Sequence, residues 1–103
     1  MSKHFFMSVD FFNDEGIKEI LNSNEVDGLD VIAAGIACAC AIFESDFDGI
    51  PMDELVEIAS HSVEMSEKIV KTAIGIFVVQ GIFLMQGERL LITPTGKLFR
   101  KCE

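Results

Sequence analysis

The sequence has few histidines, few cysteines, few basic residues and no long hydrophobic run. Its two histidines, His4 and His61, are far apart along the chain, and neither lies in a recognisable catalytic motif. G-x-S-x-G, P-loop and H-E-x-x-H patterns, which position nucleophiles, phosphates and zinc, are absent from the sequence. We therefore expect no enzymatic activity, no cofactor and no small-molecule substrate.

Three cysteines, Cys38, Cys40 and Cys102, are too few and too unevenly placed for a disulfide framework, which favours a reducing compartment. The pair Cys38 and Cys40 resembles half of a zinc site. On a helix, however, residues two apart diverge by ~200° and cannot bind one ion together. Either thiol could still join His61, His4 or Cys102 if the fold brought them close. Because buried free thiols are common core residues, we expect no bound zinc.

The stretches from Val31 to Phe43 and from Thr72 to Gly87 contain no charged residue, but both are shorter than the ~20 apolar residues that a membrane-spanning helix needs. At the N-terminus, a short apolar patch is interrupted by Asp10, which does not fit a signal peptide. We expect a soluble, cytoplasmic protein with no membrane partner, in the bacterial host cytoplasm if the chain is phage-encoded.

The scarcity of basic residues gives the chain a formal charge of −9, which disfavours contacts with nucleic-acid phosphates. The charge is unevenly distributed. Residues 1–65 contain fourteen acids and two lysines, whereas residues 66–103 contain three acids and six basic residues. An acidic body thus carries a mildly basic C-terminal third.

The 103 residues, half of them apolar, predict one domain spanning 1–103. Residues 4–9 predict a short strand. Asn13 is the expected N-cap of a first helix that ends near residue 22. Asp27 is expected to cap a second helix over 28–44, which has almost no polar face and is therefore predicted to be central.

The second half of the chain predicts two more helices and a hairpin. Pro51 suits the first position of a third helix, and residues 60–62 interrupt its pattern. Ser66 is expected to cap a fourth helix that ends at Gly81 and buries Ile74 and Phe77. Two apolar runs, 82–85 and 90–93, then predict strands joined by a tight turn. This order predicts an α+β, mainly α fold, a winged helix-turn-helix with a short N-terminal strand and a C-terminal β-hairpin wing.

Two segments resemble a known family. The opening HFFMSVDFFNDEGIKEIL and the later MSEKIVKTAIGIFVVQGIFLMQGERLLITPTGK are similar to the N-terminal domain of phage replisome-organiser and related phage replication proteins. In that family an aromatic strand leads into the first helix, and the later segment forms the third helix and the wing. The resemblance implies a winged helix that binds origin DNA.

Two candidate binding surfaces follow from the charges. A nucleic-acid face would use the basic residues of the C-terminal third, Lys68, Lys71, Arg89, Lys97, Arg100 and Lys101. A protein-binding face would use acids of the central segment, Asp46, Asp48, Asp53, Glu54, Glu57 and Glu64. The spacing of the three aspartates lacks the other ligands of a calcium loop, so we interpret them as turn and cap residues.

The charge balance favours the protein partner. Small acidic phage proteins that inhibit host nucleases, anti-CRISPR proteins among them, are similar in size and charge. We therefore expect a non-enzymatic binding protein directed at a basic protein surface, such as that of a host nucleic-acid enzyme. The alternative is a module that binds duplex DNA in phage replication or regulation. A continuous basic stripe on the fourth helix and the hairpin would favour that alternative.

Overall fold

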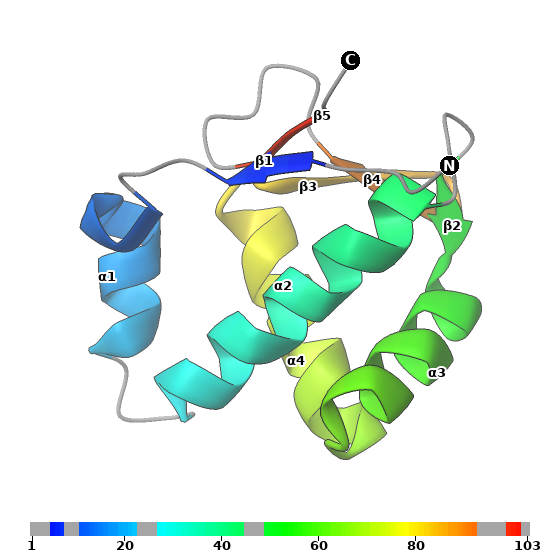
Figure 1. The fold of residues 1–103 in the computed structure, drawn as a ribbon, viewed down its shortest axis with the longest axis horizontal. Helices are drawn as coiled ribbons and strands as arrows, with labels where there is room; N and C mark the ends of the chain where they lie inside the picture. The colour runs from blue at the N-terminus through cyan, green and yellow to red at the C-terminus, as the bar shows by residue number, and fades with distance from the viewer. Residues whose placement is uncertain (1–4, 8–10, 23–26, 45–48, 93–98, 102–103) are drawn as a thin grey trace.

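Four α-helices and two small antiparallel sheets make up the part of the chain that a computed structural model describes, residues 5–7, 11–22, 27–44, 49–92 and 99–101. The helices are the 3-10 helix η1 (Phe11–Asn13), α1 (Glu15–Leu21), α2 (Gly28–Glu44), α3 (Met52–Val63) and α4 (Glu67–Val79). The strands are β1 (Phe5–Met7), β2 (Ile50–Pro51), β3 (Phe83–Gln86), β4 (Arg89–Ile92) and β5 (Phe99–Lys101). Figure 1 shows the strands gathered along one side of the molecule, with the α-helices beneath them.

The larger sheet has three antiparallel strands in the order β2-β4-β3, and β1 pairs separately with β5. Strands β3 and β4 form the predicted hairpin, and each lies one residue closer to the turn than the expected apolar run. Gly87 has a φ of 64°, which glycine adopts without steric cost, and it lies in the tight turn between the two strands. The molecule is therefore an α+β protein, mainly helical, with a small three-stranded antiparallel sheet.

Helix α2 is central, as predicted, and it begins and ends at the predicted residues. Asp27 Oδ1 accepts the backbone N–H groups of Leu29 and Asp30 at 3.1 and 3.2 Å, which satisfies two donors of the first turn. The helix packs on α1, α3, α4 and β4 (Figure 1). Within the described residues, no helix is both long and apolar enough to cross a membrane.

Helix α4 packs its apolar stripe inward and closes the core. Ser66 Oγ accepts the N–H of Ile69 at 3.4 Å, which confirms the predicted cap. Ile74 and Phe77 are buried, as predicted. Gly81, with a φ of 77°, follows the end of the helix and turns the chain into β3.

The start of α1 differs from the prediction, because Asp14 rather than Asn13 is its N-cap. Asp14 Oδ2 accepts the N–H groups of Gly16 and Ile17 at 3.0 and 3.3 Å. Asn13 instead ends η1, which places the buried ring of Phe11 in the core. The two residues are equally good caps by type, and burial of Phe11 fixes which of them is used.

Helix α3 is longer than predicted, because residues 60–62 continue it. Ser60 Oγ donates to the carbonyl of Glu57, and Ser62 Oγ donates to that of Ile58, each at 3.0 Å. These bonds satisfy both hydroxyls within the helix, so polar residues here do not end it. Pro51 lies one position earlier than expected, as the N-cap residue.

Candidate interaction surfaces

The described residues of the candidate nucleic-acid face come from three separate elements, α4, β4 and β5. Lys68 and Lys71 are exposed on α4. Arg89 begins β4 and its Nη1 donates to the carbonyl of Gly49 at 3.2 Å, so the guanidinium is held against the chain before β2. Of the remaining candidates, Arg100 and Lys101 belong to β5, and Lys97 lies outside the described residues.

A pocket of about 400 Å³ lies between the N-terminal turns of α2 and α4. Lys68 lines it together with Asp27 and Asp30, and Val31 and Ile69 contribute its apolar wall. Two carboxylates and one ammonium group therefore line the same pocket. A phosphate placed at Lys68 would also meet these two negative charges, which reduces the electrostatic gain from the contact.

A second hollow, of about 420 Å³, continues along α4 toward its C-terminus. Thr72 lines both hollows, which therefore adjoin on the surface of the helix and are together called the α4 groove. The second is lined by Gly75, Ile76 and Val79, with Lys71 and Gln80 at its sides. This part of the α4 surface is mostly apolar.

Helix α1 borders the C-terminal end of this groove. Gln80 Nε2 donates to Glu19 Oε2 at 3.0 Å, which joins the end of α4 to α1. The bond keeps a carboxylate beside the end of the groove farthest from Lys68. Carboxylates therefore lie near both ends of the α4 face, those of Asp27 and Asp30 with Lys68 at one end and that of Glu19 at the other.

Four of the six residues of the candidate acidic face lie on α3 or at its C-cap. Asp53, Glu54, Glu57 and Glu64 are all exposed. At 100° per residue, Asp53 and Glu57 lie within ~40° of arc on α3, and Glu64 follows the last helical residue as its C-cap. These three residues are called the acidic stripe of α3. The other two candidates, Asp46 and Asp48, lie outside the described residues.

Glu64 is the member of this stripe whose position the fold does not favour. Asp53 and Glu54 lie in the first turn of α3, where negative charge is stabilised by the helix dipole. Glu64 follows the last turn, where negative charge is disfavoured, and its φ of 53° is in the left-handed region that suits glycine. Its backbone N–H donates to the carbonyl of Ser60 and closes the helix. An acid here is therefore not explained by local stability.

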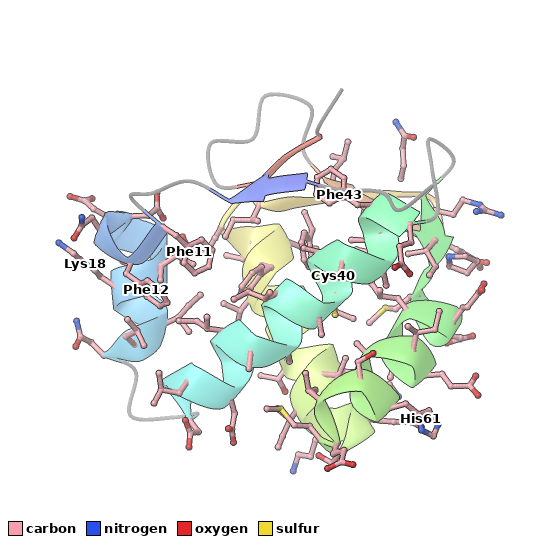
Figure 2. The ribbon with its side chains drawn as sticks, in the orientation of Figure 1. Phe11, Phe12, Lys18, Cys40, Phe43 and His61 are labelled. Carbon is pink, nitrogen blue, oxygen red and sulfur yellow. The ribbon has the colours of Figure 1, made fainter. Side chains whose placement is uncertain are left out.

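The two cysteines of α2 lie in different environments. Cys38 is buried and Cys40 is exposed. Burial raises the pKa of Cys38 to about 12, and burial followed by the charge of Glu44 raises the pKa of Cys40. Figure 2 shows Cys40 on α2 and His61 apart from it on α3. Among the described residues, no three His, Cys, Asp or Glu side chains are grouped to hold a metal ion.

These environments predict different thiol reactivities. At pH 8 we expect iodoacetamide to modify Cys40 in the folded protein and to leave Cys38 unmodified, because the nucleophile is the exposed thiolate. Since the pKa of Cys40 is raised, its rate should keep increasing above pH 9. Peptide mapping by mass spectrometry measures both sites, with the urea-unfolded chain as the control. Equal labelling of the two thiols in the folded protein would contradict the placement of Cys38.

Comparison with known proteins finds no family model, no curated protein and no solved structure that matches the chain.

Sequence reasoning identified the lysines of α4 but not the groove beside them. The groove depends on packing between α2 and α4, which brings Asp27 and Asp30 to Lys68. One sequence signal does mark the face. Lys68, Thr72, Gly75 and Val79 follow a 4-3-4 spacing, which places them on one side of a helix.

Proposed function

We propose that this chain is a winged-helix domain that binds a protein partner through the acidic stripe of α3. Support for the fold comes from the order α2, β2, α3, α4, β3, β4 and from the pairing order β2-β4-β3. In a winged helix the first strand pairs with the far strand of the hairpin in this way. Helix α4 then takes the place of the recognition helix, and β3 with β4 forms the wing.

The observation that carries the protein-binding proposal is Glu64. An acid that served only solubility could lie at any exposed position. Glu64 lies at one that both the helix dipole and the backbone conformation disfavour. Together with Asp53 and Glu57 it presents a line of negative charge about three helical turns long. Such a line is complementary to the basic surface of a nucleic-acid-binding protein. The proposed target is a host nucleic-acid enzyme, which the domain would inhibit without catalysis.

Duplex DNA binding is the second candidate function, and the position of α4 in the fold favours it. Two observations disfavour it: Asp27 and Asp30 line the same pocket as Lys68, and the surface at Val79 is apolar. A mobility-shift titration at low salt separates the two functions. Micromolar duplex binding that Lys68→Ala with Lys71→Ala abolishes would establish the DNA function and overturn the proposal.

The proposed function predicts that charge reversal on α3 weakens partner binding. The tagged protein and its Glu54→Lys, Glu57→Lys variant are used to enrich bacterial lysate proteins, which quantitative mass spectrometry compares. The purified partner is then measured by surface plasmon resonance. We expect the variant to bind about tenfold or more weakly, mainly through a slower association rate, because complementary potentials accelerate encounter. Raising the salt concentration should reduce the difference.

Two further variants make this experiment specific. Lys68→Ala with Lys71→Ala changes the charge of α4 and should leave partner binding nearly unchanged. Glu64→Gly should raise the free energy of unfolding by about 1 kcal/mol, because glycine is relaxed at positive φ, and should still weaken binding. Partner binding that survives both Glu54→Lys, Glu57→Lys and Glu64→Gly would refute the acidic stripe as the binding surface.

A further inference from the structure

We draw no further inference here: the strongest candidate, the outward side of α2 between α1 and α3, where Leu29, Ala33, Ile36 and Cys40 form an apolar stripe, is an unpartnered helix face, and nothing in the structure shows what covers it.

Discussion

Replacing Phe77 with alanine should lower the free energy of unfolding by ~3–5 kcal/mol. The ring is fully buried, and its centroid lies 5.2 Å from that of Phe83 on β3. Its far edge reaches Gly35 on α2. One side chain thus joins α4, the hairpin and the central helix, and its removal leaves a cavity between three elements that cannot all close on it. Urea denaturation followed by circular dichroism measures the loss.

The control for this substitution lies two residues away on the same helix. Val79→Ala removes an apolar side chain that is 84% exposed, so it should change the free energy of unfolding by no more than about 0.5 kcal/mol. A domain of this size has about 5–15 kcal/mol of stability, so Phe77→Ala should bring it close to unfolding at 37 °C. A loss below ~1.5 kcal/mol would mean that Phe77 is not at the centre of the core.

Elements whose signals are local could be predicted from the sequence. Asp27 and Ser66 are caps because their side-chain oxygens bond backbone groups two or three residues away, and each sits just before an apolar periodic run. Gly81 and Gly87 likewise have a local effect, because each turns the chain at its own position through a positive φ. The bounds of α2 and the existence of the hairpin follow from these positions.

Elements that depend on distant partners could not be predicted. Strand β2 has only two residues and shows no alternation. It exists because Ile50 pairs with Leu90, and Met52 N donates to the carbonyl of Glu88 at 3.1 Å. Strand β5 similarly needs β1, at the other end of the chain. Such pairings are fixed by tertiary packing, and no local propensity indicates them.

The candidate surfaces divide in the same way. Helical spacing places Asp53 and Glu57 on one side of α3, whereas the place of Glu64 depends on where the helix ends, at Val63. The environment of Lys68 could not be predicted, because Asp27 and Asp30 precede it by about forty residues and reach it only through the packing of α2 on α4. A basic residue counted from sequence as part of a phosphate-binding face thus shares its pocket with two acids.

Gly35→Ala should destabilise the fold by ~1–3 kcal/mol, although alanine is the better helix former. A Cβ at Gly35 would overlap the ring of Phe77, and even the third-nearest ring atom, Cε1, would be only 2.6 Å away. The ring cannot turn aside freely, because Phe83 packs against it and it is fully buried. The steric cost therefore exceeds the gain of about 1 kcal/mol in helix propensity. Thermal and urea denaturation measure the difference.

Two comparisons separate this overlap from a general effect of the substitution. Gly75→Ala makes the same change in a helix where no atom lies within 4 Å of the new Cβ, so it should stabilise the fold by about 0.5–1 kcal/mol. In a Phe77→Leu background the smaller side chain leaves room for the methyl group, so Gly35→Ala should cost little or become stabilising there. The two single changes would then be coupled by at least ~1 kcal/mol, as expected for side chains in direct contact. Purely additive effects would show that α2 and α4 do not meet at Gly35 and Phe77, and the packing of the core would have to be revised.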